Sequence, residues 1–226
     1  MRIAEFVKRN KIELLGFIFV YAILFINAIL THDSFIAFVS AFCGITYTIL
    51  AGKGIPLCYP IGATGSAFYA YLSFASHFWG NLVLYLFYYI PMQIIGFFKW
   101  NKNLKADKYE IIKIKLSKRE RYLFFSIALL ISFISIYVLY HLGDKNPIID
   151  GITTIFSILG MYLTVKRCIE QWIVWFIVNF LSFIMWLEIA KSGVKVYSTV
   201  IMWLVYTILA VYFYIIWFKE LKKEKA

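Results

Sequence analysis

Three tryptophans, an asparagine and a serine recur at helical spacing in an apolar stretch near the C-terminus. Trp172, Trp175, Asn179, Ser182 and Trp186 follow one another at steps of three and four residues. At about 100° per residue they share roughly a quarter of a helix circumference. The Asn179 amide needs hydrogen-bond partners that hydrocarbon cannot supply, and indole faces attract positive charge. The stripe favours a binding site for an aromatic or cationic ring over a seam between two helices.

A second polar face lies in another apolar stretch. Tyr89 and Gln93 are four residues apart and share a helix face. Pro91 lies between them, removes a backbone donor and should kink the helix by releasing the carbonyl of Phe87. Such a kink lines a cavity, serves as a hinge, or only shapes the packing.

Motifs for catalysis are absent from the sequence. It contains no GxxxxGK[ST], HExxH or GxSxG. Cys43, Cys58 and Cys168 do not have the spacing of metal ligands. We therefore expect no enzyme activity, no catalytic residue, no bound metal and no cofactor.

The composition is that of an integral membrane protein. Of 226 residues, 62% are hydrophobic and 15% are charged, whereas soluble domains carry about a quarter charged residues. The net charge is +11, but the basic residues lie between the apolar runs, as in membrane topology signals. The lipid bilayer, and not nucleic acid, is the expected partner.

Eight apolar segments are long enough, or nearly so, to cross a bilayer as helices. They are 12–30, 34–50, 55–76, 79–98, 121–142, 148–166, 169–190 and 195–218. If they alternate in direction, one side holds 20 of the 23 Lys and Arg residues. Because positive charge resists translocation, that side is the cytoplasm and contains both termini. The protein is expected to be a multi-pass protein of the cell inner (plasma) membrane.

The order of the segments predicts two parallel three-helix groups joined by one helix. The expected parts are an N-terminal span 1–33, bundle one 34–98, a basic cytoplasmic loop 99–120, a linker helix 121–147, bundle two 148–218 and a cytoplasmic tail 219–226. An odd number of connecting spans gives a parallel repeat, a design found among transporters. An offset of 117 residues supports it by pairing Tyr69 with Trp186, Tyr89 with Tyr206, and Trp100 with Trp217. The basic loop is expected to be a topology anchor and linker more than a docking site for anionic lipid or a cytoplasmic partner.

Two blocks of sequence resemble the PnuC family of vitamin transporters. They are GNLVLYLFYYIPMQIIGFFKWNKN at 80–103 and EQWIVWFIVNFLSFIMW at 170–186, and the resemblance extends over roughly 35–218. It implies a SWEET-like all-α fold, 3+1+3 spans with an extra N-terminal span. It further implies uptake of nicotinamide riboside by facilitated diffusion, with phosphorylation trapping the product for NAD biosynthesis. Trp172, Trp175, Asn179 and Gln93 are then substrate contacts; with the residues above, the full expected set is Trp172, Trp175, Asn179, Gln93, Tyr89, Trp186 and Tyr69.

Several alternatives stay open at this stage. Gly65 stands where the family pattern has an asparagine, which leaves thiamine or another vitamin as the substrate. A membrane-embedded enzyme and a helical scaffold subunit are alternatives of other classes. The oligomeric state is also open, a homo-oligomer included.

Overall fold

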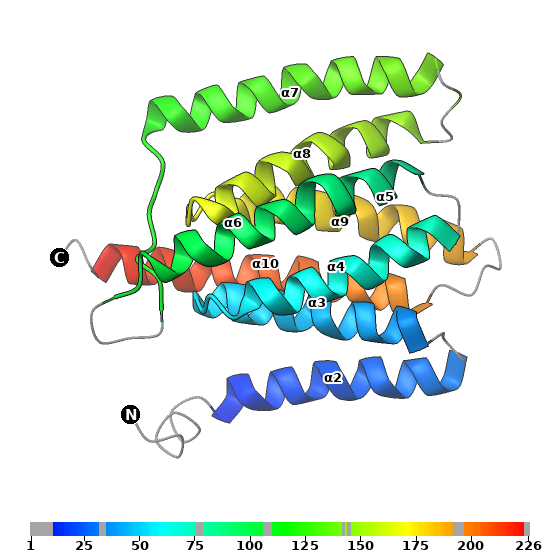
Figure 1. Cartoon of the computed structure of the whole chain (residues 1–226), viewed down its shortest axis with the longest axis horizontal. Helices are drawn as coiled ribbons and strands as arrows, with labels where there is room; N and C mark the ends of the chain where they lie inside the picture. The colour runs from blue at the N-terminus through cyan, green and yellow to red at the C-terminus, as the bar shows by residue number, and fades with distance from the viewer. Residues whose placement is uncertain are drawn as a thin grey trace.

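The chain folds into long helices that run side by side (Figure 1). The computed structural model describes residues 11–31, 35–75, 79–105, 110–141, 143, 146–191 and 197–223. The helices are α2 (Lys11–Thr31), α3 (Phe35–Lys53), α4 (Cys58–Ala75), α5 (Trp79–Leu84), the π-helix η1 (Tyr85–Tyr89), α6 (Ile90–Asn101), α7 (Lys118–His141), α8 (Pro147–Val165), α9 (Gln171–Lys191) and α10 (Tyr197–Lys223). Within these ranges no β-strand is present, and the only extended pairings are two isolated bridges. The expected all-α class is confirmed.

Each of the eight expected spans corresponds to helix in the structure. The span 79–98 consists of α5, η1 and α6 in succession, and the last span continues to Lys223. Five helical stretches among the described residues are long and apolar enough to cross a membrane: 82–101, 118–141, 147–165, 171–188 and 199–223. Shorter apolar stretches cover 15–30 and 38–53. The number of membrane crossings therefore stays a prediction, although the helices lie where the sequence placed them.

The helices pack as two groups of three with two outer helices. In the first group α4 contacts α3 and α6, and in the second α9 contacts α8 and α10. The groups meet where α3 contacts α10 and where α6 contacts α8. Helix α7 packs against α8, and α2 packs against α10 and α3 (Figure 1). The first and last helices of each group therefore enclose the space between the groups.

Pro91 distorts its helix one turn before the proline itself. Residues Tyr85–Tyr89 form a π-helical turn, and the backbone N–H of Ile90 donates to the carbonyl of Tyr85. A proline cannot donate the next helical hydrogen bond, and a widened turn is one way in which a helix adjusts to that loss. Two tyrosines of this turn, Tyr85 and Tyr89, face the space between the two groups.

Two buried tryptophans tie the groups together at one end of the molecule. The Trp100 indole N–H donates to the carbonyl of Thr164 at 3.0 Å, and the Trp217 indole N–H donates to the carbonyl of Gly52 at 2.7 Å. Both indoles are fully buried. In each case the third helix of one group is bonded to the first helix of the other. The two residues are one of the pairs related by the 117-residue offset, so the bonds support the predicted repeat.

The connector, which we define as the described residues 102–105 and 110–117 between α6 and α7, packs across the same end. The Ile111 N–H donates to the carbonyl of Gly54, in the turn after α3, at 2.9 Å. Ile114 pairs with the loop that precedes α9: its N–H donates to the carbonyl of Arg167 at 3.0 Å, and its carbonyl accepts the N–H of Ile169 at 2.9 Å. Thus the expected basic loop is shorter than 99–120, because both flanking helices extend into it, and it is a packed element.

Lys113 attaches the connector to the end of α10. Its ammonium group pairs with the Glu220 carboxylate and lies 4.9 Å from the centre of the Trp217 ring. Lys113 is 4% exposed, and this burial lowers the pKa of its ammonium group, whereas the Glu220 carboxylate acts in the opposite direction. A cation at a helix C-terminus is also favoured by the helix dipole.

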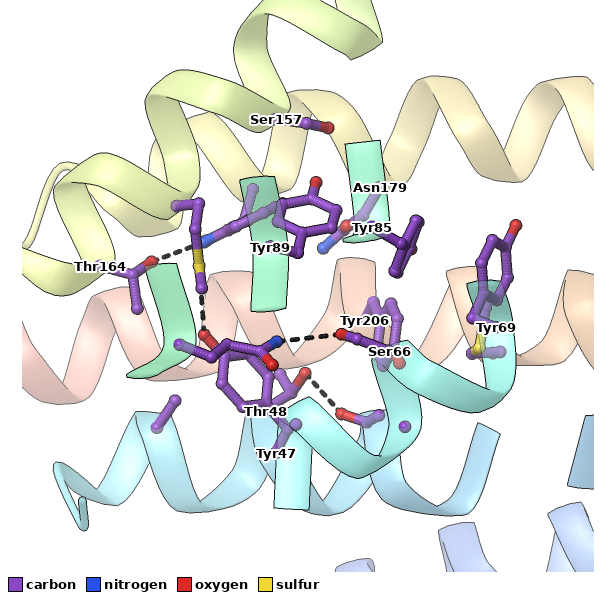
Figure 2. A pocket seen from close by; sticks show the side chains of 18 of the residues that line it. Tyr47, Thr48, Ser66, Tyr69, Tyr85, Tyr89, Ser157, Thr164, Asn179 and Tyr206 are labelled. Carbon is purple, nitrogen blue, oxygen red and sulfur yellow. Dashed lines mark hydrogen bonds between the residues drawn. The ribbon is translucent and has the colours of Figure 1, made fainter. Parts of the chain in front are cut away.

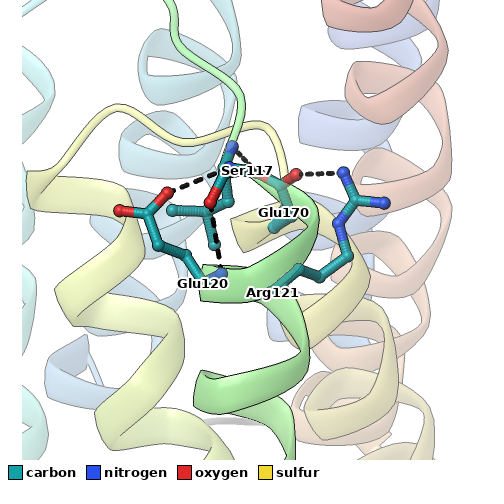
Figure 3. Close-up of polar contacts among 5 residues, drawn as sticks. Ser117, Glu120, Arg121 and Glu170 are labelled. Atoms are coloured by element: carbon teal, nitrogen blue, oxygen red, sulfur yellow. Dashed lines mark hydrogen bonds and ion pairs between the residues drawn. The ribbon is translucent and has the colours of Figure 1, made fainter.

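Glu170 joins the connector to the start of α7 (Figure 3). One carboxylate oxygen accepts the Leu116 N–H at 3.1 Å, and the other accepts a guanidinium N–H of Arg121 at 2.9 Å. Next to this buried carboxylate, Ser117 and Glu120 form a capping box, with Ser117 N to Glu120 Oε2 at 2.9 Å and Glu120 N to Ser117 Oγ at 3.2 Å. Helix α7 is therefore fixed at its first turn, although most of its length is exposed.

Candidate functional site

A cavity lies between the two helix groups. Its walls come from α3, α4, η1 and α6 on one side and from α8, α9 and α10 on the other, and the space among them, open solvent included, is about 950 Å³. Among the described residues, α2 and α7 contribute none of its lining. The space between bundled helices is a common location for small-molecule sites.

Six of the seven site residues expected from the sequence line this cavity. They are Tyr69, Tyr89, Gln93, Trp172, Trp175 and Asn179. Trp186 is half-buried, lies two turns beyond Asn179 on the same helix, and is not among the described lining side chains. The polar stripe of α9 therefore faces the cavity from its first residue to Asn179 and leaves it before the end of the helix.

The two lining tryptophans of α9 differ in how they are held. Trp172 packs against Phe213 and Trp217, with ring centres 5.3 and 5.7 Å apart. The Trp175 indole N–H donates to the Thr164 hydroxyl at 3.0 Å (Figure 2). Gly160 makes room for the latter ring, because a Cβ there would lie 3.0 Å from it. Trp175, which is half-buried, is thus fixed in the cavity wall with its position set by α8.

Gln93 is buried opposite α9. Its amide nitrogen donates to the Ser66 hydroxyl at 3.1 Å, as Figure 2 shows. Its amide oxygen has no partner in the protein. A buried acceptor without a partner is costly, so this oxygen is suited to a hydrogen-bond donor on a ligand.

Tyrosines form much of the remaining wall. Tyr69 and Tyr85 stack with their ring centres 4.5 Å apart, and Tyr85 meets Tyr89 edge to face at 4.8 Å. In Figure 2 the side chains of Tyr85, Tyr89 and Asn179 extend toward the same space. Several lining residues were not expected from the sequence, namely Tyr47, Ser66, Ser157, Thr164, Gln171, Trp203 and Tyr206. Of these, Tyr206 was available as the offset partner of Tyr89.

The cavity wall is polar but uncharged. None of the described lining residues is Asp, Glu, Lys, Arg or His. Four of the lining side chains carry buried polar atoms without a protein partner: Gln93, Gln171, Trp172 and Trp203. Such a site matches a ligand that has an aromatic face and several neutral donors and acceptors.

Gly65 lines the cavity where helices α3 and α4 approach each other closely. The hydroxyl of Ser40 donates to the Gly65 carbonyl at 3.3 Å, and a Cβ at position 65 would lie 2.8 Å from the Cβ of Cys43. Helices α3 and α4 therefore approach too closely here for any larger residue.

The known proteins that this chain resembles in sequence are named as transporters of small molecules. Residues 34–219 match the family described as "Nicotinamide mononucleotide transporter". The chain is 32% identical over 220 residues to a nicotinamide riboside transporter PnuC of Neisseria mucosa, covering 95% of this chain and 82% of that protein. It is 28% identical over 195 residues to the PnuC of Haemophilus influenzae, covering 85% and 83%.

A solved structure has the same fold. The crystal structure of the vitamin B3 transporter PnuC superposes with a TM-score of 0.82 at 29% identity, covering 94% of this chain and 92% of that one. The match to the family, over residues 34–219, includes all of the described residues that line the cavity. The chain therefore belongs to the nicotinamide mononucleotide transporter family, and it is a multi-pass membrane transporter and not an enzyme or a scaffold subunit.

Proposed function

We propose that this protein takes up nicotinamide riboside across the cell inner membrane by facilitated diffusion. The observation that carries the proposal is the cavity of aromatic rings and unpartnered, uncharged polar groups between the two helix groups. Phosphorylation in the cytoplasm then traps the product and feeds NAD biosynthesis.

The aromatic wall suits the pyridinium ring of this substrate. A delocalised cation is attracted by indole and phenol faces and needs no carboxylate. Trp175, Tyr85 and Tyr89 offer such faces around the cavity. The ribose hydroxyls are then bound by polar side chains at mid-cavity, namely Ser66, Gln93, Ser157 and Asn179.

The same wall favours a riboside over a mononucleotide. A phosphate group carries about two negative charges and is normally bound by Arg or Lys side chains. The described lining of this cavity includes neither. The riboside named for the relatives is therefore a better fit than the mononucleotide named for the family.

The mechanism is alternating access by two parallel three-helix bundles, α3 to α6 and α8 to α10, which rock around the central cavity. The reciprocal Trp100 and Trp217 bonds and the cavity-facing pair Tyr89 and Tyr206 support the repeat. Helix α7 is the linker between the bundles, and α2 is the additional first span. The assembly of several copies into a homo-oligomer is compatible with the exposed apolar surfaces of these two outer helices.

The connector end of the molecule faces the cytoplasm. Helix α2 starts at this end and α10 ends there (Figure 1). The turn between α3 and α4 and the turn between α8 and α9 also lie at this end, next to the connector. The basic residues at this end include Lys53, Lys99, Lys102, Lys113, Lys166, Arg167 and Lys219. The positive-inside rule assigns such an end to the cytoplasm.

Thiamine is the second candidate substrate. Its cationic thiazolium ring would use the same aromatic faces, and Gly65 contributes no side chain to the cavity wall. It lacks the sugar hydroxyls that the polar groups at mid-cavity would bind, so nicotinamide riboside is preferred.

Uptake into liposomes tests the proposal. Protein reconstituted in liposomes should equilibrate labelled nicotinamide riboside across the membrane, saturably and without ATP or an ion gradient. Nicotinamide mononucleotide should not enter. Protein-free liposomes are the control, and uptake of thiamine with none of nicotinamide riboside would reassign the substrate. No uptake of either vitamin would refute the proposal.

A further inference from the structure

Gln171 is a fully buried amide with no assigned role at the cytoplasmic end of the cavity. It is the first residue of α9, its side chain is 0% exposed, and it lines the cavity. Both its amide nitrogen and its amide oxygen lack a partner in the protein. An amide with two unsatisfied atoms at such depth calls for a ligand that supplies both a donor and an acceptor.

Two hydroxyls at this end of the cavity are already engaged, and the Trp172 indole N–H, which has no protein partner, can only donate. The Thr164 hydroxyl donates to the Gly160 carbonyl at 2.8 Å and accepts the Trp175 indole N–H at 3.0 Å. The Thr48 hydroxyl donates to the Gly44 carbonyl at 3.0 Å. Gln171 is thus left as the side chain that can both donate to and accept from a ligand here.

Helix geometry aligns Gln171 with two of the proposed substrate contacts. Gln171, Trp175 and Asn179 are spaced four residues apart, so they lie on one face of α9 with successive Cβ atoms about 6 Å apart. The distance from the first to the third is about 12 Å along the helix axis. A ring stacked on Trp175 therefore has one end directed to Gln171 and the other to Asn179.

We propose that Gln171 binds the carboxamide of the nicotinamide ring and so selects for it. A primary carboxamide has a donor and an acceptor in one plane, and an amide side chain pairs with it through two hydrogen bonds. The ribose has several hydroxyls and lies at mid-cavity, where Gln93 and Asn179 are available. This assignment rests on the proposed function and adds the residue that distinguishes substituted from unsubstituted rings.

The binding of two ribosides to the wild type and to two Gln171 variants tests the assignment. Affinities for nicotinamide riboside and for pyridine riboside, which lacks the carboxamide, are measured by calorimetry on purified protein. The wild type should prefer nicotinamide riboside about tenfold, in line with two net hydrogen bonds. Gln171→Met, which is similar in shape, should bind pyridine riboside as the wild type does and lose the preference. Gln171→Asn, whose amide is one methylene short, should lose it as well.

Gln93→Met is the matched control. Because Gln93 is assigned to the ribose, this variant should bind both ribosides more weakly and keep the preference. If Gln171→Met and Gln171→Asn keep the wild-type preference, the assignment is wrong while the proposed function stands. If the wild type binds neither riboside, the assignment and the proposed function fail together.

Discussion

Replacing Asn179 by leucine is expected to weaken the binding of nicotinamide riboside by about 30- to 100-fold. Asn179 is 5% exposed and lines the cavity on the same face of α9 as Trp175. Leucine has nearly the same volume but no polar atom. A ribose hydroxyl that loses its buried partner costs about 2 to 2.7 kcal/mol, which corresponds to this loss of affinity. Calorimetry on the purified variant measures the effect.

Asn101→Leu provides the matched control for that substitution. Asn101 is exposed at the end of α6, where its amide donates to the carbonyl of Phe97 at 2.8 Å. The same change of side chain outside the cavity should leave the affinity unaltered. Wild-type affinity in Asn179→Leu would mean that Asn179 does not contact the substrate.

The largest effect on stability is expected for Gly52→Ala. A Cβ at this position would lie 2.3 Å from ring carbons of Phe213, which is fully buried on α10. The Gly52 carbonyl also accepts the Trp217 indole N–H. The methyl group must separate α3 from α10, and overpacking of this kind costs about 1 to 3 kcal/mol. The melting temperature in detergent should fall by about 5 to 10 °C.

Gly16→Ala is the control for the glycine substitution. Gly16 lies on the outer helix α2, and a Cβ there would meet no atom within 4 Å. Alanine is the better helix former, so the melting temperature should stay unchanged or rise slightly. Equal melting temperatures for the two variants would show that α3 and α10 are not in close contact at Gly52.

The sequence was sufficient to predict the helices because each is long, apolar and bounded by turn residues. The sequence was also sufficient to predict the polar stripe of α9, since Trp175 and Asn179 differ in polarity and size from the aliphatic residues around them. Gln171 escaped notice because it lies at the helix start, where a polar residue is ordinary. Tyr47 and Trp203 could not be singled out, since aromatic residues make up 20% of the chain.

The connector shows a different limit of sequence reasoning. Its many charges predicted a topology anchor and linker, yet Ile111, Lys113 and Leu116 are buried against the ends of the bundles. The period-two burial of Ile111 and Lys113 is that of an extended segment. The pairing with Gly54 and Arg167, however, depends on how the two helix groups meet, and no local pattern specifies that contact. The π-turn before Pro91 was foreseen only as a kink, because its form depends on the neighbouring helices.

A structure of the protein with nicotinamide riboside tests the central claim most directly. The account predicts that the ligand lies in the cavity between the two helix groups, with its pyridinium ring against Trp175 and its ribose near Asn179 and Gln93. Ligand bound elsewhere on the protein at saturating concentration, with this cavity filled by side chains, would contradict it.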